Sequence, residues 1–346
     1  MKSYIEFLNE GFMFEKKIKK HILITTAVTL TAQSEYKKIT TELAQILFDK
    51  YSTNKYYIKK EDEEEIAQLG NDRPILYMTS NNDDYWHLGL KNLDCVYGSV
   101  IPWDKIIFSK LFQYRDWLPK TVFTLEDALK LKFPIIAKVK SGHSGVGIKK
   151  FNNAEELQKF KQPFEINLHK NKKITTNFEL YSECVEFKNE YRAFVLNGKI
   201  FYVTDRIGVD GDKSTVKGKD YQSSVEFLYI PQDYQKIPKD ITRQLEEICS
   251  TIQEDANLSY FALDWCVDNQ GKVWVFEVNK QPGMNANEVY YNYKAMYQDF
   301  YKKDIDPEIE DYILRNYVHK IFRMYYEGKE DLWAKSKWAI DYKKFM

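Results

Sequence analysis

The chain has 346 residues and carries 51 Lys and Arg against 51 Asp and Glu, so its formal net charge is zero. This balance argues against a globally basic nucleic-acid-binding protein, and 26 Tyr and 21 Phe argue against low-complexity disorder. The sequence contains no apolar run of the roughly 18 to 20 residues that span a membrane, and no Cys-x-x-Cys pair. We therefore expect a cytoplasmic protein with reduced cysteines and with neither a membrane nor zinc as a partner.

The first hundred residues predict a short arm followed by an α/β domain. Residues 1–20 are rich in Lys and Glu and predict a short helix or arm. The strand-like runs HILITTAVTL, from residue 21, and RPILYMTS, from residue 73, flank a segment with helical periodicity at 35–51. Alternating strands and helix predict an α/β domain over residues 21–103.

A glycine loop follows the strand-like run FPIIAKVK, and it is preceded by segments with helical patterns. The loop SGHSGVG, residues 141–147, has the backbone freedom to point N–H groups at phosphate oxygens. It has neither the Walker A nor the Rossmann glycine order, so a structural hairpin fits the loop as well as a phosphate site does. Lys138 lies inside the apolar strand and needs a partner, either a phosphate or a structural carboxylate.

From residue 178 onward the sequence becomes rich in strand-forming residues. The run EYRAFVLNGKIFYVTDR predicts a hairpin that turns at Asn197–Gly198, and PKDITRQLEEICSTIQEDA predicts a long helix. The run YFALDWCVDNQGKVWVFEVN predicts a second hairpin with its turn in DNQG. The remainder, from about residue 290, predicts helices whose aromatic residues favour core packing or contacts between subunits.

The second hairpin brings polar side chains together. A symmetric register about its turn pairs Asp264 with Glu277 and Ala262 with Asn279, so the two acids and the amide share one face of the sheet. Facing carboxylates repel unless a cation lies between them, and oxygen ligands of this kind suit Mg²⁺. A surface ion pair or a shifted register is the alternative interpretation.

The same alternation predicts which side chains of this hairpin enter the core. Trp274, Phe276 and Val278 are expected on the face opposite the acids, directed into the core.

In this order, the motifs over residues 104–290 resemble the ATP-grasp superfamily of carboxylate–amine ligases. They are DK before a helix, LPKT after it, FPIIAK before a loop of small residues, ELYSECVEFKNEYR, and LDW followed by VFEVNKQPGM. An Asp, a Glu-x-Asn thirteen residues later and then Pro-Gly-Met match the D-alanine–D-alanine ligase branch. The resemblance implies an α/β (α+β) ATP-grasp fold. It further implies a pre-ATP-grasp domain at 21–103, a lid or central subdomain at 104–182, a metal-bearing subdomain at 183–305 and a helical extension at 306–346.

The resemblance also implies ATP and Mg²⁺ (or Mn²⁺) as ligands of particular residues. Lys105 and Lys138 match the two lysines that contact phosphates, with Lys110 as an alternative to Lys105. The implied phosphate loop consists of Ser141, Gly142, His143, Ser144, Gly145 and Gly147, although His143 could instead face solvent. The implied adenine and ribose contacts are Glu183, Cys184, Val185 and Glu190. The implied metal ligands are Asp264, Glu277 and Asn279.

One position departs from the D-alanine ligase pattern. Those enzymes place an Arg two residues before the metal Asp, and this chain has Ala262 there. Arg192 or Arg206 of the first hairpin, together with Lys138, would then stabilise the charge that develops during catalysis.

The reaction that the resemblance implies has two steps. A carboxylate of an amino acid, a peptide or a protein tail attacks the γ-phosphate of ATP, and an amine then displaces phosphate from the acylphosphate. An ATP-grasp kinase acting on a small molecule and a non-catalytic nucleotide-binding or structural virion protein are the alternatives.

The N-terminal ten residues, MKSYIEFLNE, resemble the capsid-targeting leader of internal head proteins of T-even-type bacteriophages. Such leaders are cut after a Leu/Ile-x-Glu pattern, which Leu8 to Glu10 supply, so cleavage would leave a mature chain that begins at Gly11. The resemblance implies an enzyme packaged in a phage head and delivered to the host cytoplasm. An ordinary amphipathic helix is the alternative.

Overall fold

The computed structural model describes residues 103–140, 145–168, 172–208, 227–232, 234–280, 282 and 286–314, together with four short strands nearer the N-terminus. The predicted N-terminal arm, the helix predicted at 35–51, residues 141–144 of the glycine loop and the chain beyond residue 314 lie outside the described residues.

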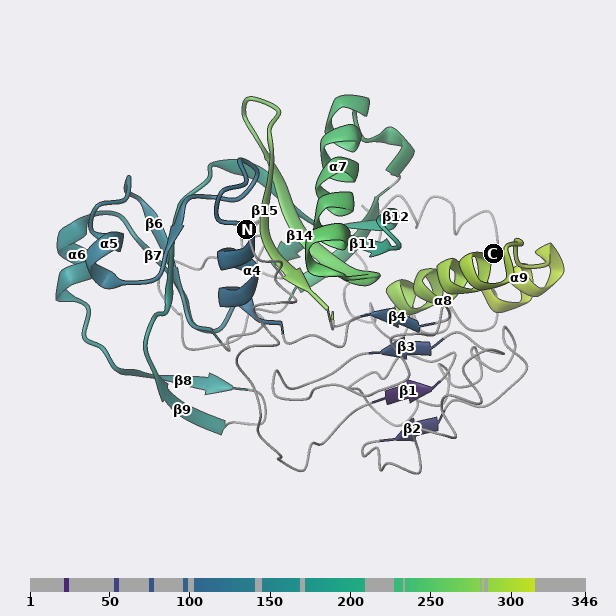
Figure 1. Cartoon of the computed structure of the whole chain (residues 1–346), viewed down its shortest axis with the longest axis horizontal. Helices are drawn as coiled ribbons and strands as arrows, with labels where there is room; N and C mark the ends of the chain where they lie inside the picture. The colour runs from purple at the N-terminus through teal and green to yellow at the C-terminus, as the bar shows by residue number, and fades with distance from the viewer. Residues whose placement is uncertain are drawn as a thin grey trace.

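The four N-terminal strands form one sheet (Figure 1). They are β1 (Ile22–Ile24), β2 (Thr53–Lys55), β3 (Ile75–Tyr77) and β4 (Val96–Gly98), in the order β2-β1-β3-β4. The two strands predicted from the apolar runs are present as β1 and β3. Strand β4 pairs in parallel with β3 and contacts the C-terminal sheet through β14.

The central unit of the described chain is a small antiparallel sheet with short helices. Helix α4 (Lys105–Leu111) begins where the Asp104 side chain accepts a hydrogen bond from the backbone N–H of Ile107. Strands β5 (Thr121–Val122), β6 (Ile135–Lys138), β7 (Ile148–Phe151) and β10 (Leu180–Glu183) are ordered β5-β10-β6-β7. The other elements here are α5 (Leu125–Ala128), α6 (Ala154–Lys159), β8 (Phe164–Leu168) and β9 (Lys172–Thr176).

The C-terminal unit is a five-stranded sheet with a long helix on one face (Figure 1). Its order is β13-β12-β11-β14-β15. The strands are β11 (Phe187–Leu196), β12 (Lys199–Gly208), β13 (Phe227–Gln232), β14 (Tyr260–Asp268) and β15 (Val273–Asn279). The β11–β12 hairpin turns at Asn197–Gly198, both with positive φ, as the sequence predicted.

Helix α7 (Lys239–Ala256) supplies the apolar cover of this sheet. Its buried Leu245 and Ile252 pack in one core with Phe261 and Leu263 of β14 and Val275 of β15. The opposite face carries the buried polar side chains of Arg192 and Asp264 beside an apolar patch of Phe194, Tyr202 and Ala262.

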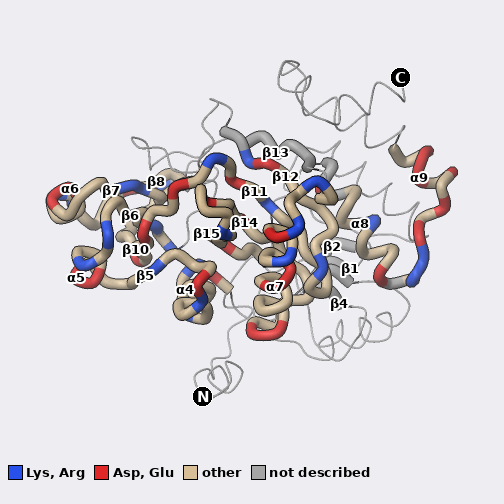
Figure 2. Tube along the Cα trace, turned by 90° about the horizontal axis from the view of Figure 1, so that it is seen from above, with Lys and Arg blue, Asp and Glu red and all other residues tan. Residues whose placement is uncertain are grey.

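Helix α8 (Ala286–Tyr301) crosses part of that opposite face, and α9 (Pro307–Ile313) follows it. Tyr291 of α8 stacks on Tyr202 of β12, with ring centroids 4.4 Å apart. None of the described helices is long and apolar enough to cross a membrane. Figure 2 shows acidic and basic residues interspersed along the described trace. The mixed helices and sheets confirm the predicted α+β class.

The register predicted for the second hairpin is confirmed where it matters most. Strands β14 and β15 pair Asp264 with Glu277 and Ala262 with Asn279. Closer to the turn the register shifts by one residue, because Trp265 pairs with Val275 and Phe276 is left as the extra residue of a β-bulge.

This bulge overturns the predicted core face of β15. Val273, Val275 and Val278 enter the core, so only Val278 follows the prediction. Trp274 is partly exposed and donates a hydrogen bond to Asp268, and Phe276 lines a cavity instead. The prediction was wrong for Trp274 and Phe276 because one extra residue reverses the side-chain alternation along the rest of a strand.

Candidate active site

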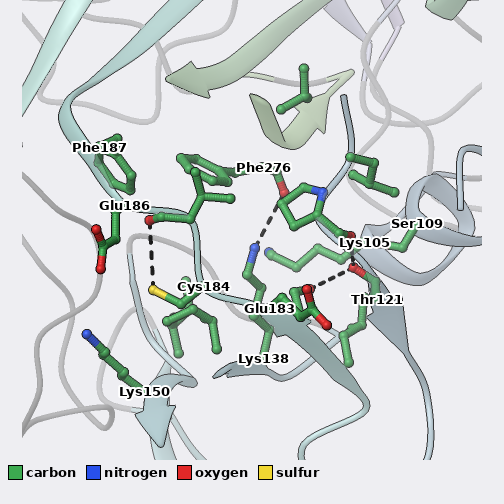
Figure 3. A pocket seen from close by; sticks show the side chains of 18 of the residues that line it. Lys105, Ser109, Thr121, Lys138, Lys150, Glu183, Cys184, Glu186, Phe187 and Phe276 are labelled. Atoms are coloured by element: carbon green, nitrogen blue, oxygen red, sulfur yellow. Dashed lines mark hydrogen bonds between the residues drawn. The ribbon is translucent and has the colours of Figure 1, made fainter. Parts of the chain in front are cut away.

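A cavity of about 400 Å³ lies between the central sheet, α4 and β15 (Figure 3). Apolar side chains from several strands line it, among them Ile136 of β6, Ile148 of β7 and Phe276 of β15. Figure 3 shows Cys184, Glu186 and Lys150 gathered at one end. The cavity therefore combines an apolar wall with charged groups.

The segment between β10 and β11 forms one wall of the cavity. Glu183, Cys184 and Val185, the residues predicted to contact adenine, all line the cavity. The backbone N–H of Cys184 donates to the carbonyl of Pro134 at 3.0 Å. The backbone of Cys184 can therefore offer only its carbonyl to a ligand, because each residue has one backbone donor. The Glu183 carboxylate accepts a hydrogen bond from the backbone N–H of Lys132 at 3.2 Å.

Two lysines reach into the cavity from different elements. Lys105 is the first residue of α4, and its Nζ lies 3.1 Å from Oε1 of Glu277. Lys138 ends β6, and its Nζ donates to the Phe276 carbonyl at 3.4 Å. Lys110 does not line the cavity, and its Nζ lies over the Phe123 ring instead. Of the two lysines weighed for the first phosphate contact, only Lys105 lies at the cavity.

The environment of Lys138 disfavours its charged form. Burial lowers the pKa of Lys138, because desolvation penalises an ammonium group. Glu277 opposes this effect, whereas the nearby Lys105 lowers the pKa further. A bound anion would reverse the shift.

A buried cluster of two arginines and two acids adjoins the lysines. It lies on the face of the C-terminal sheet opposite helix α7. Arg192 donates to both carboxylate oxygens of Asp264, at 2.7 and 3.0 Å. Nη1 of Arg206 donates to Glu190 at 2.6 Å and to Asp264 at 2.7 Å. Burial alone would raise the pKa of Asp264, but the two guanidinium groups outweigh it and hold that pKa below its usual range.

Strand register explains why these charges meet. Across the sheet, Arg192 pairs with Asp264 on one side and with Thr204 on the other, and Asp264 pairs in turn with Glu277. Directly opposed side chains on one face lie close together, so Arg192, Asp264 and Glu277 form one row, and Arg206 and Glu190 pair in a second row of the same sheet. Ala262 instead lies in an apolar patch and is fully buried.

The predicted ribose contact, Glu190, is 1% exposed and does not line the cavity. Its carboxylate is bound to Arg206, so this residue lies within the buried cluster rather than along the cavity wall. Glu186 and Lys188, which the sequence analysis did not single out, line the cavity nearby.

The predicted metal ligands differ in their surroundings. Glu277 and Asn279 are partly exposed, whereas Asp264 is buried with both oxygens bonded to arginines. Within the described part of the chain, no group of three or more His, Cys, Asp or Glu side chains is arranged to hold a metal ion. The oxygen donors of Glu277 and Asn279 fit the chemistry that Mg²⁺ prefers when phosphate oxygens complete its coordination.

The described end of the glycine loop has a structural need for glycine. Gly145 and Gly147 have φ values of 80° and 74°. A Cβ at Gly147 would lie 2.3 Å from Cγ2 of Val139. The carbonyl of Gly147 accepts a hydrogen bond from the backbone N–H of Val139 at 2.9 Å. Gly147 therefore fixes where the loop rejoins β7. Ser141, Gly142, His143 and Ser144 lie outside the described residues.

The sequence analysis missed several cavity-lining residues. Lys150 of β7 pairs with Ile136 of β6, which places the two on one face of the central sheet. Alternation along IKKF would have identified Ile148 and Lys150 once β7 was paired with β6. Phe276 could not have been identified in this way, because the alternation of residues along the strand does not predict the bulge that directs Phe276 into the cavity.

Parts of this chain are similar to a family model and to a curated protein. A family model described as YheC/D-like ATP-grasp matches residues 211–306, a segment that contains β14, β15 and α8. D-alanine–D-alanine ligase A of Bacillus cereus is 25% identical over 201 residues. This match covers 55% of the present chain and 60% of the length of that relative.

Solved structures of similar proteins include D-alanine–D-alanine ligase from Bacillus anthracis. It has a TM-score of 0.48 and 17% identity over 78% of this chain and 94% of that chain. The ATP-grasp ligase PsnB, complexed with a precursor peptide and AMPPNP, has a TM-score of 0.41 and 13% identity over 62% of this chain and 64% of that chain. The chain is therefore similar to a YheC/D-like ATP-grasp domain over residues 211–306 and to a D-alanine–D-alanine ligase over 201 residues, and it spans 60% of the length of that ligase.

Proposed function

We propose that this protein is an ATP-dependent ligase that joins a carboxylate to an amine and releases ADP and phosphate. The observation that carries the proposal is the meeting, at one cavity, of the lysines Lys105 and Lys138 with the β10–β11 segment. The match to a D-alanine–D-alanine ligase, whose name describes the joining of two amino acids, supports the reaction class.

The cavity suits a nucleotide in both shape and chemistry. Figure 3 shows Cys184 and Glu186 on one side and Lys105 and Ser109 on the other, with Lys138 between them. The apolar side chains would take the adenine ring, and Glu183 with the backbone of Cys184 and Val185 would read its polar edge. The lysines would then face the phosphates.

The charges near the lysines favour an anion. The cations are Lys105, Lys138, Arg192 and Arg206, and the carboxylates are Glu190, Asp264 and Glu277. Four cations against three carboxylates leave one positive charge, which a phosphate group would neutralise. Phosphoryl transfer depends on positioning and charge neutralisation of this kind more than on covalent help.

The proposed reaction follows from these groups. A substrate carboxylate oxygen attacks the γ-phosphorus of ATP, ADP leaves, and an acylphosphate forms. The amine then attacks the acyl carbon and phosphate leaves, while a proton passes from the amine to solvent or phosphate. Lys138 and the arginines would stabilise the negative charge on the transferred group. Mg²⁺ bound at Glu277 and Asn279 would neutralise further phosphate charge.

The class of carboxylate is an amino acid, a peptide or a protein tail. The experiment combines the full chain with ATP, Mg²⁺ and pairs of amino acids or short peptides, and measures phosphate release and product mass. A new amide together with free phosphate supports the ligase. A phosphorylated acceptor would indicate a kinase instead, and no turnover with any pair while ADP binds would indicate a non-catalytic nucleotide-binding protein.

Replacing Glu277, a proposed metal ligand that is partly exposed, provides the first variant test. Glu277→Ala should lower the rate of ADP release by about 100-fold, the scale seen when one transition-state-stabilising group is lost. Glu165→Ala is the matched control, because Glu165 is exposed on β8 and does not line the cavity. Normal ADP release by Glu277→Ala would refute the role of Glu277.

A further inference from the structure

We propose that Trp103, which lies just before helix α4, is a positioning residue for the candidate active site. Its indole N–H holds the backbone of β15 between Glu277 and Asn279. The inference rests on the proposed function, in which those two residues serve the bound nucleotide and its metal ion. Trp103 precedes the DK motif and belongs to none of the motifs that resemble the ATP-grasp superfamily.

Strand β15 lies at the edge of its sheet, so side chains from other elements help to hold its backbone. It ends the order β13-β12-β11-β14-β15, and β14 is its only strand partner in the described part of the chain. Two of its carbonyls accept hydrogen bonds from side chains. The Phe276 carbonyl accepts from Nζ of Lys138 at 3.4 Å, and the Val278 carbonyl accepts from Nε1 of Trp103 at 2.7 Å. The shorter of the two bonds is therefore the one from Trp103.

Burial makes the bond from Trp103 hard to replace. Trp103 is 6% exposed and Val278 is 3% exposed, so little water can reach the bond between them. Both residues belong to the core under the C-terminal sheet, and the Trp103 ring lies 6.2 Å from the Phe108 ring of α4. A buried carbonyl that loses its donor is costly, so β15 would have to shift if the indole N–H were removed.

The same short segment also contacts a side chain of β15. Lys105, two residues after Trp103, forms the ion pair with Glu277 at 3.1 Å. Asp104 lies between them and caps α4, because its side chain accepts from the backbone N–H of Ile107 at 2.8 Å. The capped start of the helix therefore places Trp103 and Lys105 together, and they hold two successive residues of β15.

The position of β15 matters because the proposed chemistry depends on where charges lie. Phosphoryl transfer is catalysed mainly by positioning and charge neutralisation, and a small displacement of one group can lower its rate by about 100-fold. A shift at Val278 would move Glu277 and Asn279, which lie on either side of it. Trp103 does not line the cavity, so it would act through these residues rather than on the nucleotide itself.

The test measures the affinity for ADP by titration calorimetry, once with Mg²⁺ and once with EDTA in its place. Mg²⁺ should tighten ADP binding by the unaltered protein. Trp103→Phe keeps an aromatic ring in the core but removes the N–H, so the gain in affinity from Mg²⁺ should fall by about tenfold. The affinity in EDTA should be nearly unchanged, because the apolar end of the cavity is untouched. A full gain in Trp103→Phe, or no gain in the unaltered protein, would overturn the inference.

Trp265→Phe is the matched control. Trp265 packs in the same core, and its buried Nε1 has no hydrogen-bond partner among the residues that the structure describes. The substitution therefore removes the same atoms from the core without removing a hydrogen bond, and the gain from Mg²⁺ should persist. An equal loss in Trp265→Phe and Trp103→Phe would indicate a general effect of core packing and would refute the positioning role.

If Trp103→Phe does not fold, the N-cap of α4 provides a second comparison. Asp104→Ala removes the cap, whereas Asp104→Asn keeps an acceptor for the N–H of Ile107. The gain from Mg²⁺ should be smaller in Asp104→Ala than in Asp104→Asn, and equal gains would contradict positioning from the start of α4. Failure of the unaltered protein to bind ADP, with or without Mg²⁺, would instead refute the proposed nucleotide site.

Discussion

Lys138 has the most informative surroundings of any single residue in the described chain. It ends an apolar strand, its ammonium donates to one backbone carbonyl, and burial lowers its pKa. The sequence pointed to a partner for this lysine, either a phosphate or a structural carboxylate. Its ammonium group donates to the Phe276 carbonyl, and its side chain lines the cavity, which agrees with a site for an anionic ligand.

The lowered pKa of Lys138 has a measurable consequence. Because the folded protein disfavours the ammonium and a phosphate group would favour it, nucleotide binding should take up protons, increasingly so as the pH rises above neutrality. Titration calorimetry in buffers of different ionisation enthalpy measures this uptake. In Lys138→Met the uptake should vanish, and uptake that persists unchanged would assign it to another group.

Lys138→Met should also reduce turnover by about 100-fold, as expected for the loss of one charge-stabilising group. Lys110→Met is the matched control, because Lys110 is exposed and lies over Phe123 outside the cavity. Equal activity of the two variants would contradict the assignment of Lys138 to the site. Phosphate release under saturating ATP is the measurement.

Among the secondary-structure elements, the glycine loop and the second hairpin illustrate how one residue determines the path of a strand. Gly147 is needed both for its positive φ and for its close approach to Val139. In β15, the extra residue Phe276 directs a ring into the cavity while the strand beyond it keeps the predicted pairing of Glu277 with Asp264. Local irregularities of this kind are where strand periodicity stops predicting side-chain direction.

Gly147→Ala should destabilise the protein by about 2 kcal/mol or more, because backbone strain and a side-chain clash add together. Gly271→Ala is the matched control, since Gly271 has a φ of 82° but no atom within 4 Å of the added Cβ. It should cost about 1 kcal/mol from strain alone. Urea denaturation measures both, and equal costs would show that the contact with Val139 relaxes freely.

At the scale of the whole molecule, the cavity joins elements that are distant in sequence. Lys105 and Glu277 form an ion pair across 172 positions, and the central sheet and the C-terminal sheet both contribute to the lining. A ligand held between two units should stabilise them together. The boundaries at residues 104, 183 and 306 and the role of the C-terminal helices in oligomer contacts stay predictions.

ADP with Mg²⁺ at about 100 times its Kd should raise the free energy of unfolding by about 2.7 kcal/mol, if it binds the folded chain alone. Thermal unfolding followed by circular dichroism measures the corresponding rise in Tm. The rise should be absent in Lys138→Met and present in Lys110→Met. An equal rise in both variants would place the nucleotide outside this cavity.

Sequence alone determined the parts of this protein that follow from local periodicity and turn chemistry. The turn in DNQG and strand alternation were enough to pair Asp264 with Glu277, and Asn197–Gly198 was enough to locate the first hairpin. Only the tertiary structure decided that Arg192 and Arg206 both hold Asp264, and that Phe276 faces the cavity. The physical reason is that pairing between non-adjacent strands and a one-residue bulge depend on packing across the whole sheet, which no local pattern encodes.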